Sequence, residues 1–169
     1  MSKLLYGITA WGAISGIPGC PGDYRAGISK RDLSRLQSLQ NKALRLINWS
    51  DRSTPTKTLL QDSNMLSINQ LIAFHILVQS FKIKLSKKPD YHYKRLFNNE
   101  KKNEQITKTR SNFTRRVEFR LNLGRSSFFY QANRIWMALP ANMRECTSTN
   151  QFKTMIKKWI SEKIPIKPL

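Results

Sequence analysis

Residues 67–85 read SINQLIAFHILVQSFKIKL, and this stretch decides the fold. Ser67 with Gln70 three residues later forms a capping box, a pattern that starts a helix. The apolar residues of this helix include Ile68, Leu71, Ile72, Phe74, Leu77, Val78, Phe81 and Leu85. They fall almost all round the helix axis, so we predict a central element covered by other helices. His75 on the same helix is expected to be a core histidine with a satisfied hydrogen bond.

Two more helices are predicted before residue 67. Ser29 with Asp32 three residues later marks a helix start, and the helix extends over about 30–49. Thr54 and Pro55 are the expected cap and first residue of a short helix that follows. The apolar face of the longer helix is predicted to consist of Leu33, Leu36, Ala43, Leu44 and Ile47.

The last third of the chain contains two further helix patterns. Ser126 or Ser127 caps the first of them, and Pro140 ends it. Ser148 with Gln151 forms a capping box for the second. The side chains at core spacing are Phe128, Phe129, Ala132, Ile135, Trp136 and Leu139 in the first helix and Phe152, Met155, Ile156, Trp159 and Ile160 in the second.

The remaining segments complete a mainly α architecture. The apolar opening segment, 4–11, is compatible with a helix or a strand. Residues 117–123 alternate apolar with polar side chains, as in a half-buried strand whose partner is the opening segment or another copy of the protein. We therefore predict a helical bundle over residues 1–88, a polar linker over 89–108, and a small basic helical module over 109–169 with one or two short strands.

The charge balance indicates the kind of partner. The 169 residues include 30 Lys and Arg against 10 Asp and Glu, a formal net charge of +20. Such an excess favours a polyanionic partner, and the backbone of RNA or DNA is the leading candidate. No stretch reaches the roughly 18 uninterrupted apolar residues of a membrane span. We expect a soluble protein without a membrane partner, inside the cell in the nucleus or the cytoplasm.

No catalytic centre is predicted. The carboxylates are scattered, without an Asp-Asp or Asp-x-Asp pair to hold two metal ions, and no Gly-rich loop precedes Lys-Ser or Lys-Thr. Cys20 and Cys146 with His75 and His92 cannot assemble a zinc site or a disulfide framework, and fit a reducing compartment. Cys146 with one of the histidines is the nucleophile pair to consider, but a free cysteine is far more often a packing residue. We expect no metal site and no cofactor.

Three clusters of cations are the candidate nucleic-acid contacts. The first cluster is Arg31, Arg35, Lys42 and Arg45, the second is Lys108, Arg110, Arg115, Arg116 and Arg120, and the third is Lys153, Lys157, Lys158 and Lys163. On a helix over 30–49, the first cluster projects as one stripe opposite the apolar face, where Arg forks match phosphate oxygens. A solvated face is the alternative for each cluster, and the third also suits a membrane surface or a partner helix.

Two tyrosines lie among cations. Tyr91 and Tyr93 stand beside Lys94 and Arg95, a combination that suits stacking on nucleic-acid bases. A tyrosine pair at the edge of a core has the same pattern. The sequence leaves both interpretations open.

Several short motifs, in order, resemble one protein family. They are LLYG (4–7), WG (11–12), LQ (36–37) and QNKALRLI (40–47), then TRS (109–111), IWMALP (135–140), Arg144 and the segment from Ser148 to Trp159. The first group is similar to the segment that follows the polymerase palm in non-LTR (LINE-type, jockey-like) retrotransposon reverse transcriptases. The second group resembles the C-terminal end of the same proteins. Met137 departs from the pattern, because Asn is usual at that place.

The resemblance implies a thumb-like helical region over residues 1–88, which grips template and primer, followed by a basic C-terminal module over 109–169. The family's aromatic-x-Asp-Asp active-site turn has no counterpart in this sequence. The expectation is therefore a non-catalytic, nucleic-acid-binding fragment of an RNA-directed DNA polymerase, whose partners are the RNA or DNA backbone and the missing upstream polymerase region. A stand-alone basic RNA-binding protein and an interaction module for an acidic partner are the alternatives.

Overall fold

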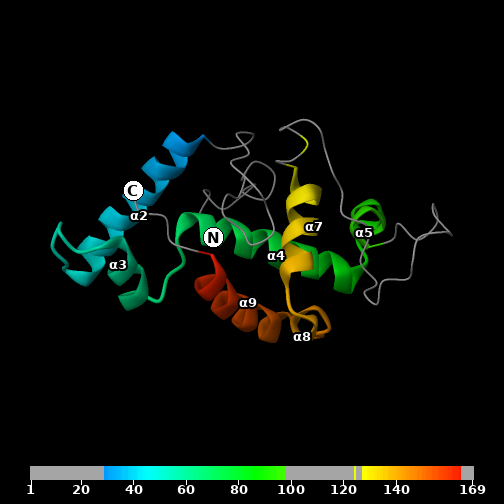
Figure 1. Ribbon diagram of the computed structural model, residues 1–169. Helices are drawn as coiled ribbons and strands as arrows, with labels where there is room; N and C mark the ends of the chain where they lie inside the picture. Colours follow the sequence, from blue (N-terminus) through cyan, green and yellow to red (C-terminus); the bar gives the residue numbers. More distant parts are fainter. Residues whose placement is uncertain (1–28, 98–123, 125–126, 165–169) are drawn as a thin grey trace.

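A computed structural model describes residues 29–97, 124 and 127–164 (Figure 1). Within these residues the fold is mainly α, as predicted, with seven helices and no strand. The helices are α2 (Lys30–Asn48), α3 (Thr56–Asp62), α4 (Ile68–Ser86), α5 (Asp90–Phe97), α7 (Phe128–Ala138), α8 (Ala141–Arg144) and α9 (Thr149–Lys163). The opening segment 4–11 and the predicted strand 117–123 lie outside the described residues.

The central helix of the prediction is α4. The hydroxyl of Ser67 accepts from the backbone N–H of Gln70, and the Gln70 side chain accepts from the N–H of Ser67 at 3.0 Å, so the capping box is confirmed. The helix packs against α2, α5, α7 and α9 (Figure 1). Because neighbours surround it, apolar residues on several of its sides are excluded from water, as an all-round apolar helix requires.

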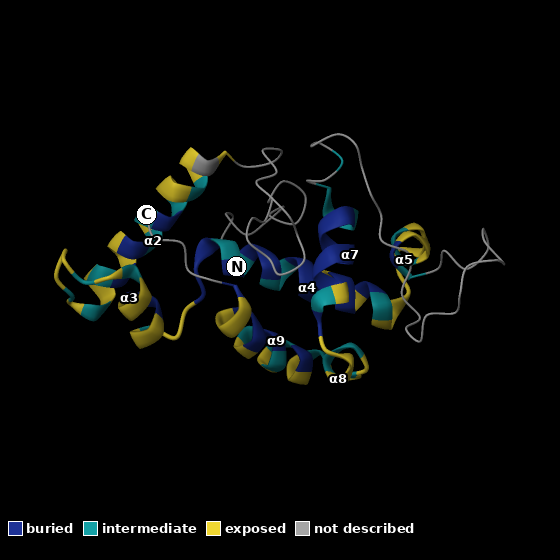
Figure 2. Cartoon of the chain, viewed as in Figure 1, coloured by how far each residue is buried: buried dark blue, intermediate teal, exposed yellow. Residues whose placement is uncertain are grey.

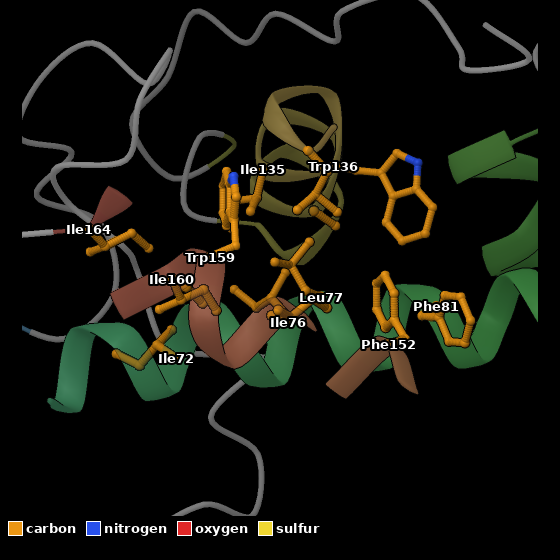
Figure 3. Packing of buried hydrophobic residues seen from close by; sticks show 14 of the residues in the cluster. Ile72, Ile76, Leu77, Phe81, Ile135, Trp136, Phe152, Trp159, Ile160 and Ile164 are labelled. Carbon is orange, nitrogen blue, oxygen red and sulfur yellow. The ribbon is translucent and has the colours of Figure 1, made fainter. Parts of the chain in front are cut away.

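One hydrophobic core joins helices that are far apart in the sequence. The rings of Phe81 on α4 and Phe152 on α9 are fully buried and stacked, with their centroids 3.8 Å apart (Figure 3). Trp136 from α7 lies on the same cluster, 5.9 Å from the Phe152 ring. Trp159 and Ile160 of α9 are buried in it too, as predicted from their spacing.

The helix α5 forms inside the range predicted as a polar linker, 89–108. Leu96 is buried in the shared core, and the Phe97 ring meets the Trp136 ring edge-on at 5.6 Å. These two apolar side chains hold α5 against α7 and α4. Residues 98–108 of the range lie outside the described residues.

The predicted starts of α2, α7 and α9 are correct in position, although not all of them form the predicted bonds. Ser29 accepts from the N–H of Asp32 at 3.1 Å, and Ser127 accepts from that of Tyr130. The capping box predicted for α9 is wrong. Ser148 makes no side-chain cap bond. The side-chain amide oxygen of Gln151 accepts from the Cys146 thiol instead.

The start of α3 also differs by one residue. Pro55, predicted as the first helical residue, is the N-cap, with an extended backbone at φ −60° and ψ 144°. Its carbonyl oxygen accepts from the N–H of Leu59, so the helix begins at Thr56. The predicted cap Thr54 instead offers its carbonyl oxygen to the Arg45 guanidinium at 3.1 Å.

The buried face of α2 is rotated from the predicted one. Leu44 is buried as expected, but the predicted core residues Ala43 and Ile47 face solvent, while the polar Gln37 and Asn41 are buried. Leu33 and Leu36 are only partly buried against the main core. The prediction assumed that burial follows apolarity, and it fails because hydrogen bonds compensate the two buried amides.

Those hydrogen bonds connect three helices. The side-chain amide oxygen of Gln37 accepts from the backbone N–H of Ile68, at the start of α4, at 3.0 Å. The Gln37 amide nitrogen donates to Asn41 at 3.0 Å, and Asn41 donates to the hydroxyl of Thr56 on α3 at 2.9 Å. A free N–H at the start of α4 therefore receives its acceptor from α2.

Replacement of Gln37 by Ala is expected to destabilise the fold by about 1–3 kcal/mol, because the N–H of Ile68 and the amide of Asn41 lose buried partners. Urea unfolding followed by circular dichroism measures the change. Gln79→Ala, at an exposed position of α4, is the matched control and should change stability little. Equal effects of the two substitutions would contradict the role given to the Gln37 hydrogen bonds.

Candidate nucleic-acid interface

A basic groove lies between α3, the first half of α4 and α9. Its volume is about 890 Å³. Its four lysines are Lys57, Lys153, Lys157 and Lys158. The first comes from α3 and the other three come from α9, so the groove is made by segments from distant parts of the chain.

The packing of α9 on α4 positions the three lysines of α9. Phe152, Ile156 and Trp159 are buried in the core, which turns the intervening positions 153, 157 and 158 toward the groove. Lys157 reaches across and donates to the backbone carbonyl of Asn64 at 2.8 Å. This bond connects α9 to the loop before α4 and holds one wall of the groove against the other.

The floor of the groove is largely apolar. Leu60, Leu66 and Phe74 line it together with the exposed side chain of Met65. The buried Gln70 donates to the carbonyl of Ile164 at 2.8 Å, which fixes the chain just after α9 beside the floor. Four ammonium groups over an apolar floor can hold an anion whose remaining surface is apolar or aromatic.

Negative charge is scarce at this groove. Among the described residues that line it, Glu162 is the one carboxylate, against four lysines. Gln61, Thr154 and Ser161 add neutral polar groups on the lining. Lysine ammonium groups and neutral side-chain donors of this kind are what proteins use to contact phosphate oxygens.

The first cation cluster is only partly a solvent-facing stripe. Arg31, Arg35 and Lys42 are exposed on α2. A carboxylate oxygen of Asp32 lies 3.6 Å from the Arg35 guanidinium and offsets part of its charge. Arg45 is half-buried, because its guanidinium donates to the carbonyl of Thr54 and closes the loop between α2 and α3.

The second and third cation clusters differ in how much of each the structure describes. All of the second cluster, Lys108, Arg110, Arg115, Arg116 and Arg120, lies outside the described residues. Of the third cluster, Lys153, Lys157 and Lys158 line the groove, whereas Lys163 is an exposed residue at the end of α9. Sequence reasoning missed Lys57, since it stands alone in α3 and only the packing of the helices places it opposite the third cluster.

The tyrosine pair separates into two roles. Tyr93 packs against the core, with its ring centroid 5.6 Å from that of Phe97. Tyr91 is exposed, and its hydroxyl oxygen accepts from the Arg95 guanidinium at 2.6 Å. The same guanidinium lies over the Phe129 ring, 4.4 Å from its centroid. Tyr91 is therefore the more exposed of the two tyrosines.

The titratable side chains of the described residues bear on the predicted absence of a metal site and on the predicted roles of His75 and Cys146. Within residues 29–97, 124 and 127–164, no group of three or more His, Cys, Asp and Glu side chains could hold a metal ion. His75 is half-buried, and burial, with a contribution from Lys82, lowers its pKa. Burial also lowers the pKa of Lys84, whose ammonium lies over the Trp136 ring. Cys146 is partly buried against the core, as expected of a packing residue.

Nothing in the described helices combines the length and apolarity needed to cross a lipid bilayer. Comparison of the chain with protein-family models, with curated proteins and with solved structures found no match. The groove and its lysines are therefore the basis on which a function is proposed.

Proposed function

We propose that this chain is a non-catalytic nucleic-acid-binding protein that holds a phosphate backbone in the groove between α3 and α9. The observation that carries the proposal is the convergence of four lysines on one groove, Lys57, Lys153, Lys157 and Lys158. Among the described residues that line this groove, one is a carboxylate. A solvated charged face needs no such convergence from two helices. A polyanion that runs along the groove needs positive charge from both helices.

The chemistry of binding follows from the residues of the groove. The ammonium groups contact phosphate oxygens as point charges, and each contact releases a condensed counterion. Phe74 and Met65 in the floor offer apolar surface to sugars and bases. None of the described residues that line the groove is an arginine whose fork could read a base edge, so the binding is proposed to be independent of nucleotide sequence.

The resemblance to non-LTR retrotransposon reverse transcriptases adds a context to this proposal. The chain would be the thumb and C-terminal part of an RNA-directed DNA polymerase, which holds template and primer while another region carries the metal-binding aspartates. Its site of action would be the nucleus or the cytoplasm, where RNA and DNA backbones are available. The motifs in residues 36–47 and 135–159 support this context.

Binding is expected to weaken steeply with salt. A plot of the logarithm of the affinity against the logarithm of the salt concentration should be linear, with a slope of roughly −0.7 to −0.9 for each phosphate contacted. Fluorescence anisotropy with labelled single-stranded and primer–template oligonucleotides of unrelated sequences measures it. Slopes near zero, or affinities that differ strongly between sequences of the same form, would be inconsistent with the proposal.

A further inference from the structure

The outer face of α2 exposes a row of large apolar side chains. Leu39 is 60% exposed, Leu46 78%, Ile47 69% and Trp49, at the end of the helix, 96%. Figure 2 colours much of α2 as exposed. Large apolar side chains gathered on an exposed helix are typical of an interaction site. We define these four residues as the α2 apolar row, in which Leu39 and Leu46 form the central line and Ile47 and Trp49 lie on either side of it.

We propose that the α2 apolar row docks an amphipathic helix of a partner protein that carries carboxylates along one edge. The spacing of the row is the first argument. Leu39, the exposed Ala43 and Leu46 follow one another at steps of four and three residues, the repeat of helices that pack side by side. Ala43 is small, so the backbone of a facing helix can approach α2 closely at this position.

The cations beside the row determine the charge of the partner. With 3.6 residues per turn, Arg35 and Lys42 fall along one edge of the line through Leu39 and Leu46. The other edge leads through Ile47 and the half-buried Gln40 toward the buried side of the helix. Cations on one edge match a partner helix with Asp or Glu along the facing edge.

Other occupants fit these observations less well. A second copy of the chain would bring the same cations and a net charge of +20 against this surface. A helix at a bilayer surface carries its cations on the side away from the lipid. In α2 that opposite side is occupied by the buried Gln37, Asn41 and Leu44, and Arg35 and Lys42 lie beside the row instead.

A designed helical peptide tests the proposal directly. The probe is a fluorescein-labelled peptide with Leu at the a and d heptad positions and Glu along one edge, and its binding to the full chain is followed by anisotropy. We expect the double variant Leu39→Gln/Leu46→Gln to bind at least tenfold more weakly. The matched control is Leu85→Gln/Met137→Gln, which changes two exposed apolar residues elsewhere and should retain binding.

Further peptides and variants separate docking from bulk charge. A peptide of the same composition with scrambled leucines, and one with Lys in place of Glu, should bind at least tenfold more weakly than the probe. Equal binding of any of these peptides, equal loss in the two double variants, or no binding of the probe would overturn the proposal. So would anionic phosphatidylglycerol vesicles that bind the chain through the row, as shown by loss in the Leu39→Gln/Leu46→Gln variant alone.

The proposal does not depend on the nucleic-acid function. The groove lysines are not part of the α2 apolar row, so the Leu39→Gln/Leu46→Gln variant should bind oligonucleotides as the unchanged chain does. Conversely, a chain that fails to bind nucleic acid can still dock the peptide. The two assays therefore fail separately, and circular dichroism of each variant confirms that the helices are intact.

Discussion

Replacement of Lys57, Lys153 and Lys158 together by Gln is expected to weaken binding to a primer–template duplex about a hundredfold near physiological salt. The estimate follows from three lost phosphate contacts, each with a salt slope of roughly −0.9. The slope itself should flatten by up to about three units. Lys157 is left in place, because its ammonium holds the carbonyl of Asn64 and its removal would disturb the groove. Anisotropy titrations at several salt concentrations measure both quantities.

Two other triple variants remove the same charge from different surfaces. Arg31→Gln/Arg35→Gln/Lys42→Gln changes the exposed cations of α2, and the second control replaces Lys82, Lys87 and Lys88 by Gln at the end of α4. Both should reduce affinity less than the groove variant, because they lower only the general attraction of the chain for a polyanion. If all three variants weaken binding equally, net charge alone explains the affinity and the groove has no special role.

Phe152→Ala is expected to destabilise the fold by about 3–5 kcal/mol, the range for truncation of a buried phenylalanine. The ring of Phe152 is fully buried and stacked on Phe81 at 3.8 Å, and it also contacts Trp136. Its loss leaves a cavity where α4, α7 and α9 meet. Since helices from both ends of the described chain share this core, urea unfolding should show one transition that shifts as a whole.

A substitution at an exposed apolar position is the control for this measurement. Leu85→Ala, on the same central helix, removes a side chain that is 45% exposed and lies outside the buried cluster, and it should change stability by less than about 1 kcal/mol. Two separate unfolding transitions, or a Phe152→Ala effect as small as that of Leu85→Ala, would contradict the shared core.

The positions of the candidate cations were predicted unevenly. The sequence identified Lys153 and Lys157 as part of a cation cluster, and the structure places both in the groove. It assigned Arg45 to the same stripe as Arg31, but Arg45 closes a loop by its bond to Thr54. Charge spacing along one helix shows which cations can share a face, whereas the use of each cation depends on which carbonyl groups other segments bring near.

The sequence by itself determined the position and burial of the central helix. The capping box of Ser67 and Gln70 is made within one turn of chain, so its residues are sufficient to specify it. The all-round apolarity of 68–85 likewise required cover from other helices, whatever their arrangement. The core positions of Trp136, Phe152 and Trp159 also followed from the sequence, through the spacing of apolar residues along each helix.

Only the tertiary structure decided the orientation of α2 and the existence of the groove. The amide of Gln37 is buried because the start of α4 brings an N–H group that needs an acceptor. With this face of α2 buried, Ile47 is exposed to solvent. Lys57 meets Lys153 and Lys158 because α3 and α9 lie on either side of the same groove. Such pairings depend on contacts between segments distant in sequence, which the periodicity of a single helix does not encode.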